Sequence, residues 1–371
     1  MKLTRAFNTS LERFSGIYLW VVFMVVFSLW TPHEFFTVST FHSVATAQAV
    51  QGMLAIAVLV PLVAGQFDLS VGANANLAGI VAIVAQTMWH WPLLWAVVIA
   101  VVVGFAVGFV NGFVVVRLRV NSFIATLGMG SILAAFLVIV TNSTQPAPVE
   151  STVFDNLAQY SVGGITIVVF EMLALALIAY WVLDWTPVGR RLYATGGNAE
   201  AARLSGIRVN RIAWGSLVVS GGIAGISGVL FSSLYGPSLS FGPTLLLPAF
   251  AAAFLGSTQL QPGRFNVWGT LIAIYVLATG VEGLQLVSGQ QWLSNMFNGV
   301  ALIAAVALAV SRERRDGSRK VRDTRRGAAA AELEGFEEGP STALESVEGI
   351  VSDPGTAAVV GADRERGTGH R

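Results

Sequence analysis

Side chains able to bind, cap or ionise are unevenly spread along this chain, and one dense group lies at 186–211, TPVGRRLYATGGNAEAARLSGIRVNR. Asn198 is a good N-cap, Glu200 would place a negative charge in a first helical turn, and Arg203 a positive charge near the last turn. Gly206 can adopt the left-handed conformation that ends a helix. The interval therefore predicts a capped helix of roughly two turns inside a polar loop.

Groups that could catalyse a reaction or hold a metal do not occur in recognisable patterns. The chain has no cysteine, and its four scattered histidines give no metal-ligand spacing. No nucleophile–base pair and no GxxxxGKS/T phosphate-binding loop is found. We predict no catalytic residue, no metal and no cofactor bound by this chain.

The composition indicates a membrane protein, because 54% of the residues are hydrophobic and only 12% are charged, about half the charged share of a soluble domain. A spanning helix needs about 20 mostly apolar residues. The apolar runs therefore predict an all-α polytopic fold with about ten spans. These are 14–30, 43–64, 71–88, 93–116, 122–141, 165–183, 213–235, 246–260, 267–287 and 292–310.

Basic residues between the spans predict the orientation, since cytoplasmic loops retain Lys and Arg. An even number of spans puts both termini on one side. With the N-terminus in the cytoplasm, the inner loops contain Arg117, Arg119, the arginines of 190–211 and Arg264, whereas the outer loops contain none. The polar interval then lies in the cytoplasm, between the sixth and seventh spans.

Three parts of the chain follow from this topology. We expect a cytoplasmic segment at 1–13, a transmembrane domain at 14–311 with its polar loop at 184–212, and a cytoplasmic tail at 312–371. Eight basic residues between 312 and 326 would lie against anionic membrane lipids. The rest of the tail lacks apolar periodicity and is predicted to be disordered.

The turn GQFDLSVG at 65–72 contains Asp68, the only charge in the first inner loop. Its carboxylate is predicted to cap the third span by accepting backbone N–H groups. Asn74 and Asn76 follow on different faces of that span, where an unpaired amide is costly. They either form hydrogen bonds to neighbouring helices or line a polar path, and the sequence leaves both interpretations open.

Glycines repeat every four residues at 104–112 in the fourth span, and a similar stripe occurs at 221–228 in the seventh. Small residues let helix backbones approach closely, and we expect this packing within one subunit. The outer loop 142–164 carries Glu150 and Asp155 but no basic residue. A soluble partner docking there would present basic side chains.

Three motif blocks resemble permease subunits of ATP-binding-cassette (ABC) importers, in the ribose, xylose and monosaccharide branch that is related to branched-chain amino acid permeases. The first is GQFDLSVG at 65–72, and the second is NG followed by RLRVNSFIATLG within 111–128. The third is GRRLYATGGNAEAARLSGI at 189–207, which contains the EAAxxxG pattern. The blocks occur in the family's order, whereas the glycines near 256–270 match less well.

The resemblance implies roles for particular residues. The helix between spans six and seven would couple to an ATPase through Gly197, Asn198, Glu200, Ala201, Ala202, Arg203 and Gly206. A translocation path would involve Asp68, Asn74, Asn76, Asn111, Phe123, Thr126 and Leu127, the last three being gate candidates on span five.

The resemblance also implies partners and a substrate. We expect a non-catalytic subunit of the bacterial inner membrane that pairs with a second permease subunit, identical or different. Two cytoplasmic subunits would bind ATP and Mg²⁺, and an extracytoplasmic protein would deliver a pentose or hexose; nucleic acid is not a partner. Branched-chain amino acids or nucleosides are the alternative substrates. An ion-coupled transporter is less favoured, because Glu171 and Glu282 lie in the outer thirds of their spans without basic partners.

Overall fold

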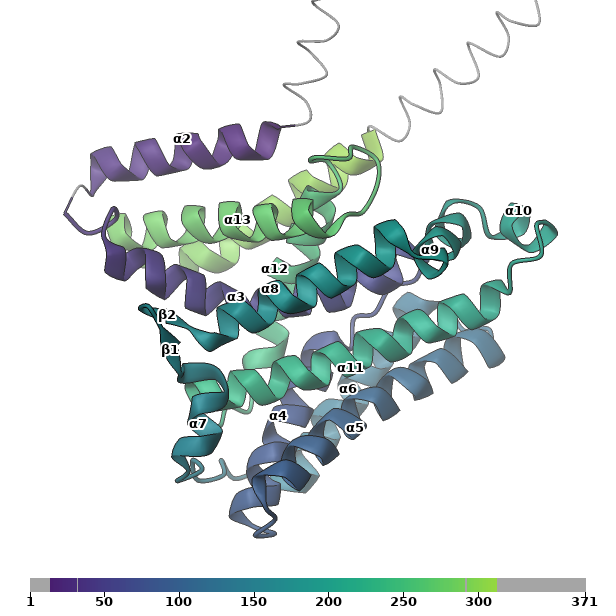
Figure 1. Ribbon diagram of the computed structural model, residues 1–371, viewed down its shortest axis with the longest axis horizontal. Coiled ribbons are helices and arrows are strands. Elements are labelled where there is room, and N and C mark those ends of the chain that lie inside the picture. The colour runs from purple at the N-terminus through teal and green to yellow at the C-terminus, as the bar shows by residue number, and fades with distance from the viewer. Residues whose placement is uncertain (1–13, 32, 291, 312–371) are drawn as a thin grey trace, which may run out of the picture. The chain divides into compact units, whose positions relative to one another are not determined.

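The computed structural model describes residues 14–31, 33–290 and 292–311, and a helix occupies the place of every predicted span (Figure 1). The predicted segment 1–13 and tail 312–371 lie outside the described residues. The helices are α2 (Ser15–Trp30), α3 (Val38–Val63), α4 (Val71–Thr87), α5 (Leu93–Gly112), α6 (Ser122–Thr141), α8 (Ile167–Tyr180), α11 (Val209–Tyr235), α12 (Phe241–Gly256), α13 (Val267–Ser288) and Trp292–Ser311.

Seven helical segments of the described chain are long and apolar enough to cross a membrane, which confirms a multi-pass helical protein. Two of them are longer than the α-helices named above, since the π-helices η1 (Phe113–Arg117) and η2 (Trp181–Trp185) extend α5 and α8. Helices α2, α4 and α12 are apolar but shorter than these seven segments. The number of spans, about ten, therefore stays a prediction.

Short elements connect the long helices. The loop between α6 and α8 contains α7 (Thr152–Gln159) and a two-stranded antiparallel hairpin of β1 (Ser161–Val162) and β2 (Ile165–Thr166). The polar interval contains α9 (Pro187–Gly197) and α10 (Ala199–Leu204).

The eighth predicted span begins earlier than expected. Phe241, Gly242 and Pro243, which precede the predicted span 246–260, form the first turn of α12. Proline is tolerated there because the N–H groups of a first turn have no partner within the helix.

The centre of the helix bundle is formed by α3 and α11, whose most apolar windows are 78% and 72% buried. The most apolar windows of α6 and of Trp292–Ser311 are only 17% and 6% buried. Helix α11 packs against α3, α4 and α5, and Figure 1 shows it lying beside α5. The periphery is therefore apolar but exposed, as expected for a surface that meets lipid or another membrane subunit.

The predicted glycine stripes meet where α5 crosses α11. A Cβ atom on Gly104 would lie 2.6 Å from the carbonyl oxygen of Gly221 and 2.8 Å from the Cα of Gly225. Only hydrogen fits at this distance, so the two backbones are in direct contact. This confirms the prediction that the stripes pack within one subunit.

Candidate functional site

The turn between α3 and α4 holds Asp68 in the protein interior, where it is 1% exposed. Its Oδ1 accepts hydrogen bonds from the backbone N–H of Ser70 at 3.1 Å and from the Ser70 hydroxyl at 2.6 Å. Its Oδ2 accepts one from the hydroxyl of Ser220, on α11, at 2.8 Å. No described cation forms an ion pair with this carboxylate, so hydroxyl and amide donors solvate it.

The prediction that Asp68 caps α4 was wrong. The N-cap of α4 is Ser70, and no side chain makes a capping hydrogen bond there. Asp68 lies two residues before that position and accepts a single backbone N–H. Its second oxygen accepts a hydrogen bond from Ser220, so the carboxylate joins the turn to α11 instead of capping α4.

Three more hydrogen bonds join the turn between α3 and α4 to side chains of α5 and α6. The Nδ2 of Asn111, at the end of α5, donates to the Ser70 hydroxyl at 2.8 Å. The hydroxyl of Thr126, on α6, accepts from the Leu69 N–H at 2.9 Å, and Ser122 accepts likewise from the Phe67 N–H at 3.0 Å. The turn is therefore attached to α5, α6 and α11 through polar side chains that are costly to leave unpaired.

Both asparagines of α4 form hydrogen bonds to other segments. The Nδ2 of Asn74 donates to the carbonyls of Gly104 and Gly221, at 3.3 and 3.2 Å. Asn76 donates to the Ser238 carbonyl at 3.1 Å and accepts from the Gly242 N–H at 2.9 Å. The first of the two interpretations is thus realised in this conformation. Whether either amide also lines a path stays a prediction.

The three gate candidates on α6 divide by exposure. Thr126 is buried, whereas Phe123 and Leu127 are 47% and 53% exposed. The Phe123 ring packs edge-on against Phe67 with centroids 6.2 Å apart. The structure therefore brings Thr126 to the Asp68 turn and leaves Phe123 and Leu127 on an apolar outer face of α6.

The predicted helix of the polar interval is α10, and its capping follows the sequence. The Oδ1 of Asn198 accepts the Ala201 N–H at 3.0 Å, and Glu200 pairs with Arg203 at 3.2 Å. Gly206 has a φ of +82°, the left-handed conformation expected after the helix end. Ala202 is buried, whereas Gly197 and the other residues of the pattern are exposed. Helix α10 thus presents an exposed face.

Helix α9 was not expected. Thr186 caps it by accepting the Gly189 N–H at 3.4 Å, and Pro187 follows at the first helical position. Thr-Pro is a recognised helix start, so this signal was present in the sequence. Gly196 packs closely against the end of α3, since a Cβ atom on Gly196 would clash with the Val63 carbonyl oxygen.

Three side chains from separate segments, which we call the inner clamp, fasten α9 to the bundle: Asp184 of η2, Tyr193 of α9, and Arg264 of the α12–α13 loop. Arg264 pairs with Asp184 at 3.1 Å, and its guanidinium carbon lies 3.7 Å from the centroid of the Tyr193 ring. The Tyr193 hydroxyl donates to the Phe265 carbonyl at 2.6 Å. Burial raises the pKa of the Tyr193 hydroxyl, which stays a neutral donor.

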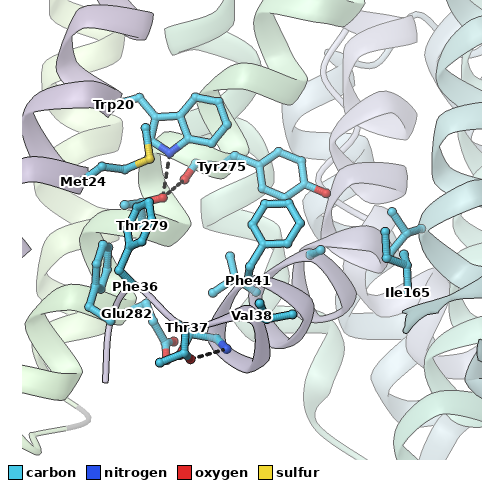
Figure 2. A pocket seen from close by; sticks show the side chains of 15 residues that line it. Trp20, Met24, Phe36, Thr37, Val38, Phe41, Ile165, Tyr275, Thr279 and Glu282 are labelled. Carbon is cyan, nitrogen blue, oxygen red and sulfur yellow. Dashed lines mark hydrogen bonds between the residues drawn. The ribbon is translucent and has the colours of Figure 1, made fainter. Parts of the chain in front are cut away.

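An apolar cavity of about 510 Å³ lies between α2, α3 and α13. Figure 2 shows Trp20, Tyr275 and Phe41 around it, with Trp20 donating to the Thr279 hydroxyl at 2.9 Å. Glu282 is its only charged lining residue. A sugar needs many hydrogen-bonding groups, so this cavity is a poor candidate for a sugar site.

Comparison with known proteins gives a consistent assignment. A family model described as the branched-chain amino acid transport system / permease component matches residues 40–306. The ribose import permease protein of Escherichia coli (strain K12) is 32% identical over 305 residues, covering 80% of this chain and 92% of the relative. The L-arabinose ABC transporter permease protein of Azospirillum brasilense is 29% identical over 298 residues, covering 79% and 86%. The xylose transport system permease protein of Escherichia coli (strain K12) is 27% identical over 370 residues, covering 83% and 94%.

The matched region includes the Asp68 turn, the start of α6, and α9 with α10, which are the three blocks that carried the resemblance in the sequence. With its helical bundle and its motif blocks in family order, the chain belongs to the family of permease components of branched-chain amino acid transport systems.

Proposed function

We propose that this chain is the permease subunit of an ABC importer and carries a monosaccharide, a pentose or hexose, across the bacterial inner membrane. The observation that carries the proposal is α10, a capped helix with an exposed face at the end of a loop that is clamped to the bundle. Relatives named as ribose, arabinose and xylose permeases support the substrate class.

In this proposal the chain performs no chemistry. A partner subunit binds ATP and Mg²⁺ and hydrolyses the nucleotide, and its conformational change displaces α10. The inner clamp joins α9 to η2 and to the α12–α13 loop, so a displacement of the loop is passed to two parts of the bundle at once. Motion is then converted into alternating access.

The solute would pass beside α6, between this chain and a second permease subunit. The exposed Phe123 and Leu127 would face that path, and Thr126 would link it to the turn of Asp68. Asn74, Asn76 and Asn111 would keep the neighbouring helices in register through their buried amides. This arrangement uses α6 because it is the least buried of the helices that contact the Asp68 turn.

The outer surface would receive the sugar-binding protein at α7. Ser233 of α11 fixes this helix by donating to the Phe154 carbonyl at 2.7 Å and accepting the Ala158 N–H at 3.1 Å. Glu150 and Asp155 flank the helix start, so the docking protein would contribute basic residues. Reversing both charges should weaken binding-protein-stimulated ATPase activity of the assembled importer.

Deleting residues 199–205 tests the coupling role directly. The variant should still insert in the membrane, because its apolar helices are unchanged, but it should no longer co-purify with the ATPase subunits. A glycine–serine segment of equal length in place of 199–205 controls for chain connectivity and should also fail. Co-purification that survives both changes would contradict the docking role of α10.

A reconstitution experiment separates the ATP-driven mechanism from ion coupling. Vesicles containing this chain alone should not accumulate ribose, xylose or arabinose, with or without an ion gradient. Accumulation driven by a proton or sodium gradient would favour a secondary transporter. Because the family is described for branched-chain amino acids, leucine is the competing solute, and the ligand bound by the co-expressed binding protein decides between them.

A further inference from the structure

Three arginines of the polar interval, to which the proposed function gives no role, line a single pocket. Arg191 of α9, with Arg208 and Arg211 at the start of α11, surrounds a cavity of about 560 Å³. All three side chains are exposed. Arg208 is the N-cap residue of α11, and Arg211 lies in the first turn of that helix. The remaining lining residues are Ser205, Gly206, Ile207 and Ile212.

The pocket contains positive charge without a counter-charge. No acidic residue lines it, and the two ion pairs of the described chain are made by other arginines, Arg203 and Arg264. The start of α11 adds the positive end of a 27-residue helix that has no side-chain cap. Guanidinium groups facing one cavity repel each other, and an anion that accepts hydrogen bonds from several of them relieves this repulsion.

The ends of two candidate membrane spans indicate the depth of the pocket. The span Ile167–Trp185 ends shortly before Arg191, and the span Val209–Tyr235 begins directly after Arg208. Trp185 is 68% exposed, and indole side chains are enriched at the membrane–water interface. The three arginines therefore lie at the depth of that interface. Phosphate groups of lipids occupy the same depth, which favours a lipid over an acidic segment of a soluble partner.

We propose that Arg191, Arg208 and Arg211 bind the phosphate group of an anionic phospholipid at the base of α10. The planar guanidinium groups match phosphate oxygens with paired N–H donors. The lipid would bridge α9 and α11, the two helices that flank α10 in the chain, while its acyl chains remain in the bilayer. Basic pockets between helices on the cytoplasmic side are a known mode of headgroup recognition.

The test uses the full-length protein alone, in detergent micelles, and does not depend on the transport proposal. Phosphatidylglycerol, phosphatidylcholine and inorganic phosphate are titrated separately, and bound molecules are counted by native mass spectrometry. We expect retention of phosphatidylglycerol in preference to phosphatidylcholine. Replacing Arg191, Arg208 and Arg211 with Gln should weaken phosphatidylglycerol binding about a hundredfold, since each arginine contributes to the electrostatic attraction.

A matched variant removes the same charge elsewhere. Arg117, Arg119 and Arg190 are exposed arginines outside the pocket, and replacing all three with Gln should leave phosphatidylglycerol binding within about twofold of the original. Replacing the pocket arginines with Lys keeps the positive charge, so this variant still tests the proposal if the Gln variant fails to fold. It should give an intermediate loss, because lysine lacks the paired donors.

Each other outcome counts against the proposal. Equal losses in the pocket and matched variants would show diffuse attraction and no site. Saturation by inorganic phosphate that displaces phosphatidylglycerol would assign the pocket to a free anion. Unchanged lipid binding in the pocket variant, together with lost co-purification of the ATPase subunits, would assign the arginines to a protein interface.

Discussion

Replacing Asp68 tests whether this buried carboxylate serves geometry or contacts the solute. The Asp68→Ala variant removes the acceptor of three hydrogen bonds, from the Ser70 N–H, the Ser70 hydroxyl and the Ser220 hydroxyl. The hydroxyls can rotate to other acceptors, whereas the N–H cannot. A buried unsatisfied donor costs about 1–3 kcal/mol.

The net effect is smaller than the sum of three bonds, because removing a buried charge also removes its desolvation cost. We expect the free energy of unfolding to fall by about 2–4 kcal/mol for Asp68→Ala. Ser220→Ala leaves one carboxylate oxygen without its donor and should cost about 1–3 kcal/mol. Asp68→Asn keeps one acceptor and the side-chain shape, so about 1 kcal/mol is expected.

Thermal unfolding in detergent, uptake in reconstituted importer and ATPase co-purification are measured on the same preparations. Stability and uptake should fall in the same order, with Asp68→Ala worst and Asp68→Asn mildest. Co-purification should persist, since α10 is a separate element. Glu150→Ala, which changes an exposed acid in the loop between α6 and α8, is the control and should change stability by less than about 0.5 kcal/mol. Wild-type stability in Asp68→Ala with abolished uptake would refute the geometric role.

Three further substitutions test other contacts. Gly104→Leu should destabilise the protein by about 3 kcal/mol or more, because the leucine side chain would have to displace the Gly221 carbonyl at the α5–α11 crossing. An unchanged melting temperature would contradict this packing. Arg264→Gln and Asp184→Asn should each reduce uptake per ATP hydrolysed. A double-mutant cycle on the free energy of unfolding should give a coupling energy between the two residues of about 1 kcal/mol. This energy is small because the Arg264 side chain is 41% exposed. Asn198→Ala should weaken the α10 cap by about 1 kcal/mol and reduce co-purification with the ATPase subunits. Asn198→Ser keeps a capping side chain and should restore this co-purification. Equal co-purification by both variants would argue against a role for the cap.

Local features were predictable because their physical cause lies within a few residues. The cap of α10 depends on Asn198 and an N–H three positions away, and Gly206 ends the segment by its own conformational freedom. Each long apolar run became a helix because a bilayer leaves no other partner for its backbone polar groups. The start of α9 at Thr186 and Pro187 was equally local, and it was missed because the polar composition suggested a loop.

Contacts between distant segments were not predictable in this way. Asp68 accepts from Ser220, which is 152 positions later in the chain, and nothing near Asp68 indicates that partner. The inner clamp joins η2, α9 and the α12–α13 loop, and the pocket arginines come from α9 and α11. No periodicity connects such positions.

The sequence by itself determined the helical membrane character, the family and the short capped helix between apolar runs, since hydrophobic length, motif order and capping are properties of contiguous residues. Only the tertiary structure decided that Asp68 joins a turn to α11, that Asn74 bonds to two glycine carbonyls, and that three arginines face one cavity. The reason is physical: a hydrogen bond or an ion pair depends on which surfaces the packed helices bring within about 3 Å, and that choice is made by the packing of all helices together.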